Sequence, residues 1–379
     1  MSSILFEKKR ANINGIGARL ATILVGLCLS FFWQGQPFLQ QQLASEALAL
    51  HPWMPAAVFS AAVLLGSLLS IFFIRLGDWR RLTLIGGLVS GFAFAVPAFV
   101  PGATVLLVCL GLAGLFAGFG LSAAITCLGD TANPVGSFGG LLLLQALVAV
   151  GLESAEPALQ QLGSFRNGLL VVAAVALLAI PFSRLMPSSG SKRVSLLNNS
   201  DSGLSAELLT ALAGGALLFL AAGVLWYLSG PLADVQQLSI GAALMLVLLL
   251  ARAAGGLVAT LLGNRAGVVP PLVLAAVLVL IGLGLLQFLA GENGYLAAFA
   301  LIGGAGFLAA AYVMGLIAHL DGSGRFAPLA LAVPLFGLMV GHLVAGKLAG
   351  GQSPVVLWSA MAALWVVGTL LLLWAAKRR

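Results

Sequence analysis

The sequence predicts an all-α integral membrane protein of twelve transmembrane helices with both termini in the cytoplasm. Three observations carry this prediction. The 379-residue chain is 61% hydrophobic and 8% charged, with a mean hydropathy of +1.12. Twelve stretches are long and apolar enough to cross a bilayer. The basic residues fall almost entirely into alternate loops between those stretches.

Composition excludes the other broad classes. A soluble globule of this size needs a charged surface, which 18 basic and 11 acidic side chains cannot supply. A bilayer removes that need because lipid surrounds the outer faces of the helices. The basic residues do not share one surface, so the net charge of +7 indicates membrane orientation and not a nucleic-acid partner. The three cysteines lie in apolar stretches and are interpreted as buried small side chains.

The predicted spans follow one another closely. They cover residues 18–40, 55–75, 83–100, 103–127, 135–153, 168–186, 208–231, 238–262, 268–290, 295–318, 328–350 and 353–376. With a cytoplasmic N-terminus, the loops on that side contain Lys8, Lys9, Arg10, Arg19, Arg75, Arg80, Arg81, Arg184, Lys192, Arg193, Arg265, Arg325, Lys377, Arg378 and Arg379. Only Arg166 falls outside, while Arg252 and Lys347 fall within spans. A missed or invented span would destroy this asymmetry, so the pattern supports twelve.

A polar linker at 188–207 divides the chain into two predicted six-helix bundles, residues 1–187 and 208–379. Three pairs of stretches indicate an internal duplication. "FFWQGQPFLQQQL" in span one matches "VLWYLSGPLADVQQL" in span seven, and "IRLG" (74–77) matches "NRAG" (264–267). An Asp also precedes a Phe by five to eight residues after spans four and ten. The same order in both halves makes each match more significant.

These features resemble the major facilitator superfamily over essentially the whole chain. That family has a signature loop between spans two and three, approximately Gly-x-x-x-Asp-Arg-x-Gly-x-Arg-Arg. Here the sequence keeps its arginines and second glycine but has Ser70 for the first glycine and Ile74 for the aspartate, with Asp78 as an alternative carboxylate. The resemblance implies that this loop and its second copy lock the outward-open state. The implied gating residues are Arg75, Gly77, Asp78, Arg80, Arg81, Asn264, Arg265, Asp130, Asp321 and Arg325. A purely topogenic role for the charges is the alternative.

Arg252 is the leading candidate for solute binding. It lies eleven residues before Gly263, about 16 Å from the cytoplasmic end of its span at 1.5 Å per residue. The side chain cannot reach water over that distance, and no Asp or Glu lies near the middle of any span. A cationic centre without an acidic partner favours an anionic or carboxylate-bearing solute. An arginine bonded to carbonyls and glutamines for structure is the alternative.

Other polar and aromatic residues complete the predicted site. The resemblance implies that spans 1, 4, 7 and 10 line a central cavity, with spans 2, 5, 8 and 11 beside them. Glutamine both donates and accepts hydrogen bonds, which suits hydroxylated or zwitterionic solutes. Trp33 and Trp226 occupy equivalent places and suit either stacking on a ring or anchoring at the membrane interface. The remaining candidates are Gln34, Gln36 and Gln145.

His342 and Glu153 are candidates for proton coupling. His342 lies in the outer third of span eleven, and histidine is the residue type most often used to carry a proton in proteins. Glu153 lies at a comparable depth in the other half. Hydrogen bonding across helices is the simpler role for His342.

The sequence therefore predicts a secondary or facilitative transporter of a small organic solute, working by alternating access. We expect a monomer in the inner membrane of a bacterium, without cofactor or metal, and with a proton as the possible coupling ion. A multidrug or neutral-metabolite exporter of the same fold is the runner-up, and a non-transporting receptor or scaffold is a third reading. No nucleotide-binding loop or nucleophile–base pair indicates an enzyme.

Overall fold

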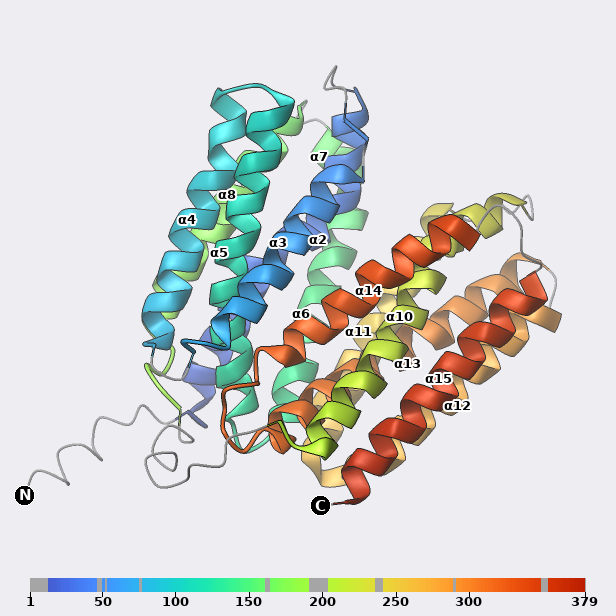
Figure 1. Cartoon of the computed structure of the whole chain (residues 1–379). Helices are drawn as coiled ribbons and strands as arrows, with labels where there is room; N and C mark the ends of the chain where they lie inside the picture. Colours follow the sequence, from blue (N-terminus) through green and yellow to red (C-terminus); the bar gives the residue numbers. More distant parts are fainter. Residues whose placement is uncertain are drawn as a thin grey trace, which may run out of the picture. The chain divides into compact units, whose positions relative to one another are not determined.

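The computed structural model is all-helical in its described part (Figure 1). It describes residues 13–45, 50–51, 53–74, 77–160, 164–190, 204–235, 241–288, 291–348 and 354–378. The helices are α2 (Ile16–Ser45), α3 (Met54–Ser70), α4 (Trp79–Phe99), α5 (Ala103–Gly129), α6 (Pro134–Ser154), α7 (Glu156–Gln160), α8 (Phe165–Ser183), α10 (Ala206–Val235), α11 (Gly241–Leu262), the 3-10 helix η1 (Gly263–Ala266), α12 (Val269–Phe288), α13 (Glu292–Leu320), α14 (Leu329–Leu348) and α15 (Pro354–Lys377).

Eleven helices in the described part of the chain are long and apolar enough to cross a membrane, and α3 is a shorter apolar helix of 17 residues. The predicted all-helical, multi-span class is confirmed to that extent. Helix α3 ends at Ser70, earlier than the predicted span, and the chain continues as a turn over 71–74. The hydroxyls of Ser67 and Ser70 donate to the carbonyls of Val63 and Ser67 in its last turns. Such bonds compete with regular helical hydrogen bonding.

The chain divides into two compact units. The first consists of Met1–Ser137, Ser154–Ser202 and Asp321–Leu331, and the second of Phe138–Glu153, Gly203–Leu320 and Ala332–Arg379. Most of α6 therefore groups with the later helices. The predicted bundle boundaries at 187 and 208 remain a prediction.

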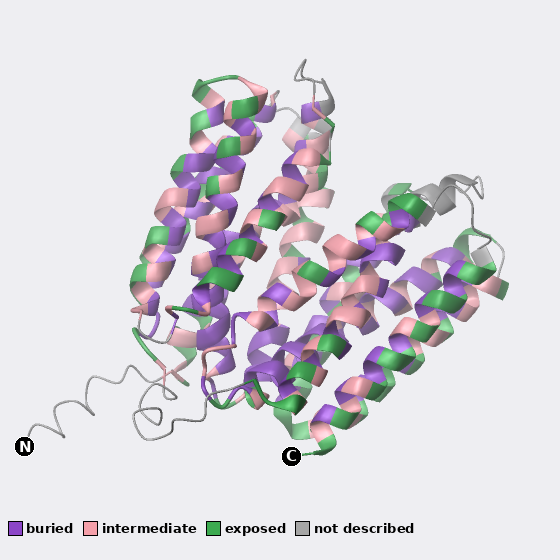
Figure 2. Cartoon of the chain, viewed as in Figure 1, coloured by how far each residue is buried: buried purple, intermediate pink, exposed green. Residues whose placement is uncertain are grey.

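Each unit is built around one deeply buried helix. In the first unit α5 packs against α2, α3 and α4, and in the second α13 packs against α10, α11 and α12. Residues 120–129 of α5 and 308–318 of α13 are buried without interruption. Exposed apolar side chains recur instead along α4 and α15 (Figure 2). Helices with such apolar outer faces fit a lipid environment.

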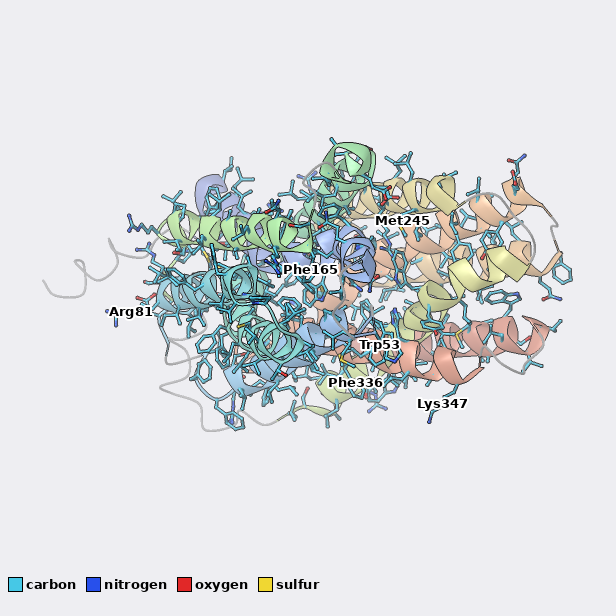
Figure 3. All side chains as sticks on the ribbon, turned by 90° about the horizontal axis from the view of Figure 1, so that it is seen from above. Trp53, Arg81, Phe165, Met245, Phe336 and Lys347 are labelled. Carbon is cyan, nitrogen blue, oxygen red and sulfur yellow. The ribbon has the colours of Figure 1, made fainter. Side chains whose placement is uncertain are left out.

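Two charged side chains, Arg81 and Lys347, lie at the ends of helices. Arg81 points outward at the start of α4, where its side chain is 84% exposed, and Lys347 projects from the end of α14 (Figure 3). Phe165, by contrast, is buried at the start of α8. Lys347 is thus placed to extend its amino group toward an interface, as long basic side chains near helix ends do.

Candidate functional site

Arg252 lies near the middle of the 22-residue helix α11 and is partly buried. Its guanidinium carbon Cζ is 3.9 Å from the ring centroid of Trp226 on α10 and 5.2 Å from that of Phe307 on α13. These distances are typical of cation–π contacts. Within the described part of the chain, the guanidinium makes no hydrogen bond and no ion pair. Its five N–H donors therefore lack a protein acceptor there.

Glycines explain why α11 and α13 bring this group together. A Cβ atom on Gly255 would strike the carbonyl oxygen of Gly304, so the two helices meet backbone to backbone at that point. Gly255 lies one turn after Arg252, and Gly304 lies one turn before Phe307. Residues three apart share a helix face, so the close glycine contact places Arg252 beside Phe307.

The structure thus joins two predicted solute contacts, Arg252 and Trp226, and adds one that sequence reasoning missed. Phe307 lies in the glycine-rich stretch "GGAGF" of α13. The available signal was an aromatic side chain one turn beyond a close-packing glycine. Without the partner helix, that residue has no distinguishing feature.

The candidates on α2 belong to the first unit. The indole Nε1–H of Trp33 donates to Ser60 Oγ at 2.9 Å, and its ring meets Phe59 edge-on. Trp33 is therefore held by α3. Gln34 Oε1 is buried and accepts no hydrogen bond in the described part of the chain. Gln36 is partly buried. Gln34 thus retains an open acceptor, while the solute-binding roles of all three remain predictions.

Gln145, Glu153 and His342 belong to the second unit. His342 Nδ1 lies 2.7 Å from the carbonyl oxygen of Leu338, so this nitrogen carries the proton that is donated. The imidazole also meets the Tyr227 ring edge-on at 6.0 Å. Gln145 and Glu153 are partly buried and each has an interaction partner. The hydrogen bond to Leu338 lies within α14, and only the ring contact with Tyr227 crosses to another helix. Hydrogen bonding across helices and proton coupling both remain predictions for His342.

The predicted gating loop between α3 and α4 is tied to the segment after α8. Arg80 Nε donates to the carbonyl of Met186, and the backbone N–H of Trp79 donates to Ser188 at 3.0 Å. Asp78 caps α4 by accepting from Arg80 N at 2.9 Å, and Arg81 Nε lies 3.8 Å from its carboxylate. Arg75 lies outside the described residues.

Close packing completes this cluster. A Cβ atom on Gly190 would lie 2.5 Å from both Asp130 Oδ2 and the Trp79 ring. Gly77 is similarly confined, since its Cβ atom would lie 3.2 Å from the Phe73 carbonyl oxygen. The sequence predicted gating roles for Gly77, Asp130 and the arginines but not for the 184–190 segment. That segment is contacted through the backbone carbonyl of Met186, and every residue type has such a carbonyl.

The corresponding residues after α11 and α13 differ in their contacts. Asn264 and Arg265 are exposed in η1, and the Asn264 carbonyl accepts from Gly267 N at 3.1 Å. Asp321 is 2% exposed and accepts from Ser323 Oγ at 2.7 Å and from the Phe326 N–H at 2.8 Å. The guanidinium of Arg325 lies 5.6 Å from the Phe326 ring. Asp321 therefore orders its own loop, and a gating role for these residues remains a prediction.

Solved structures match the chain over nearly its whole length. FucP, a major facilitator superfamily transporter in the outward conformation, has a TM-score of 0.69 at 13% identity, covering 95% of this chain and 98% of that one. The chain has the major facilitator superfamily fold. A second structure with this fold, the E. coli fucose:proton symporter FucP, has a TM-score of 0.67 at 14% identity, covering 95% of this chain and 98% of that one. The human organic anion transporter MFSD10 has a TM-score of 0.69 at 15% identity, covering 97% of this chain and 99% of that one. No protein-family model and no curated protein matches the sequence.

Proposed function

We propose that this chain is a secondary transporter that carries a small organic solute, anionic or carboxylate-bearing, by alternating access. The major facilitator superfamily fold supports the transport mechanism. The proposal places both termini in the cytoplasm, with residues 1–187 and 208–379 as the two moving bundles. It takes the protein as a monomer in the inner membrane of a bacterium, with a proton as the candidate coupling ion.

The observation that carries the anion proposal is the state of Arg252. A charge in the middle of a membrane span costs at least several kcal/mol unless its environment compensates for it. The aromatic rings of Trp226 and Phe307 compensate in part, yet the N–H donors of Arg252 lack acceptors within the described residues. A bound carboxylate would supply two acceptor oxygens in the geometry that a guanidinium fits. One structural match is an organic anion transporter, but the proposal for this chain rests on Arg252.

A neutral hydroxylated solute is the second candidate, and Gln34 favours it. Its buried amide oxygen has no donor within the described residues, which a hydroxyl or amide N–H of a solute would supply. Export of lipophilic cations is less favoured, because no Asp or Glu lies in the middle of a described span. A receptor or scaffold would not require an open guanidinium.

Counterflow in proteoliposomes tests the proposal. The purified full-length chain is assayed with anionic, neutral and cationic metabolites, and wild type is compared with Arg252→Gln and Arg252→Lys. We expect exchange of an anion that falls at least tenfold in Arg252→Gln, since a charge-assisted hydrogen bond is lost. Lysine should restore little of this activity, because it lacks the planar guanidinium that donates two parallel hydrogen bonds to a carboxylate. Equal exchange by all three proteins would exclude Arg252 as the solute contact.

A further inference from the structure

Arg252 is the only lysine or arginine on helices α10, α11 and α13 in the described part of the chain, and this limits which solute charges the contact can bind. Among the charged residues of these helices, Glu207 precedes Trp226 by 19 positions and Asp234 follows it by eight. Glu292 precedes Phe307 by 15 positions. At 1.5 Å per residue even the nearest of these backbone positions is about 12 Å away along the helix. A solute at Arg252 thus meets one positive charge and no nearby negative charge from these helices.

His342 is a titratable group on α14, a helix that packs against α10. It contacts Tyr227, the residue that follows Trp226 on α10. Adjacent residues on an α-helix point about 100° apart, so Tyr227 and Trp226 occupy different faces of α10. The Nδ1–H of His342 is already donated to Leu338. His342 is therefore not placed as a second cation beside Arg252.

The helix positions around the three residues are apolar. The neighbours three and four positions away on the same helix faces, where the structure describes their side chains, are small or aliphatic. They are Ala222, Gly223, Leu248, Leu249, Gly255, Gly256, Gly303, Gly304, Ala310 and Ala311. An ammonium or second carboxylate brought here would lose hydration without gaining an ionic partner. An apolar group would lose nothing by the same transfer.

From these observations we propose that Arg252, positioned by Trp226 and Phe307, makes the protein selective for singly charged carboxylates with an apolar body. The carboxylate accepts hydrogen bonds from the guanidinium edge, and the aryl or alkyl body lies among the small apolar residues. Dicarboxylates and amino acids are rejected because their second charge is left without a partner. This inference rests on the proposed function, since it names the solute class of the same site.

Trp226 and Phe307 are positioning residues in this scheme. An unsupported arginine side chain loses rotamer freedom when it binds, and ring contacts reduce that loss by holding the guanidinium beforehand. Trp226→Phe keeps an aromatic face, whereas Trp226→Leu and Phe307→Leu remove one. Substitutions at Trp226 and Phe307 should therefore change the affinity for the carboxylate without changing which charge class of solute is preferred.

Binding to the purified full-length protein in detergent tests the inference, with titration calorimetry as the readout. The probes share a benzene ring: benzoate, terephthalate, phenylalanine and benzyl alcohol, with hexanoate as an aliphatic monocarboxylate. We expect benzoate and hexanoate to bind at least tenfold more tightly than the other three. Arg252→Gln and Arg252→Lys should weaken benzoate binding about ten- to a hundredfold. Trp226→Leu and Phe307→Leu should weaken it about three- to tenfold, and Trp226→Phe less.

A second cation–π pair in the chain offers a matched control. The Arg378 guanidinium lies 4.6 Å from the Trp374 ring at the end of α15. Arg378→Gln and Trp374→Leu remove the same kinds of group there and should leave benzoate binding unchanged. Size-exclusion chromatography verifies that each variant is folded, and Arg252→Lys preserves the positive charge where Arg252→Gln does not fold.

The outcomes separate this inference from the function it rests on. If terephthalate, phenylalanine or benzyl alcohol binds as tightly as benzoate, the selectivity is wrong. Counterflow that depends on Arg252 but prefers dianions or zwitterions would also overturn the selectivity and leave the transporter proposal standing. Benzoate binding in the expected order with no counterflow of any solute would instead contradict transport and support the binding site. Unchanged benzoate binding in Arg252→Gln would overturn the site itself.

Discussion

Two charged side chains, Asp321 and Arg252, differ sharply in their hydrogen bonding. Asp321 is almost fully buried, and its carboxylate accepts from Ser323 and Phe326. Arg252 has aromatic neighbours but makes no hydrogen bond or ion pair in the described part of the chain. Buried charges normally have such partners. Asp321 therefore stabilises its loop, whereas the N–H donors of Arg252 have no acceptor among the described residues, which supports the proposed solute contact.

We expect Asp321→Ala to destabilise the protein by about 3 kcal/mol, because it leaves one buried and one partly buried backbone N–H group without an acceptor. Asp321→Asn, which keeps one acceptor oxygen, should cost less. Asp78→Ala is the comparison, since that more exposed carboxylate caps a single N–H and should cost about 1 kcal/mol. Apparent melting temperatures in detergent measure all three. A smaller loss for Asp321→Ala than for Asp78→Ala would contradict this reading.

For whole helices, glycine contacts determine how closely neighbouring helices approach each other. On α5, a Cβ atom on Gly114 or Gly118 would lie 2.5 Å from a carbonyl oxygen of α3. Gly255 and Gly304 make the same kind of contact between α11 and α13. Small residues spaced four apart allow helix backbones to touch, which replaces the hydrophobic driving force that is absent in lipid. In the second unit this contact also positions the residues around Arg252.

The pair Gly255→Ala and Gly306→Ala tests that contact on the same two helices. No atom lies within 4 Å of a Cβ atom on Gly306, so alanine there should stabilise α13 by about 0.5–1 kcal/mol through helix propensity. Alanine at Gly255 must separate α11 from α13. It should lower the apparent melting temperature and also weaken benzoate binding, because Phe307 moves away from Arg252. Equal effects of the two substitutions in both assays would show that the glycine contact is not required.

For the whole molecule, hydropathy and the asymmetry of basic residues predicted much of the fold. Each segment that crosses a bilayer must have a minimum length and an apolar composition. Nearly every apolar helix lies where the sequence placed it, and the structural matches confirm the fold. The early end of α3 was missed because hydropathy does not register serine side chains bonding to their own helix. Arg252 and Trp226 were found as separate candidates. Phe307 and the Met186 carbonyl were missed, because those contacts join segments far apart in sequence.

The central claim is that Arg252 contacts a solute that reaches it from either side of the membrane in turn. Chemical restoration of charge at this position tests it most directly. Cys28, Cys109 and Cys127 are first replaced by alanine, and Arg252→Cys is then introduced and reconstituted in proteoliposomes. Counterflow is measured before and after reaction with a cationic or an anionic membrane-impermeant methanethiosulfonate, applied from one side at a time.

We predict that the cationic reagent restores part of the exchange of a monocarboxylate when it is applied from either side. The anionic reagent should restore none, because the solute needs a positive partner. Added monocarboxylate should slow the reaction of either reagent with the introduced cysteine, because it occupies the same place. Equal effects of the two reagents, or reaction from one side only, would contradict the account.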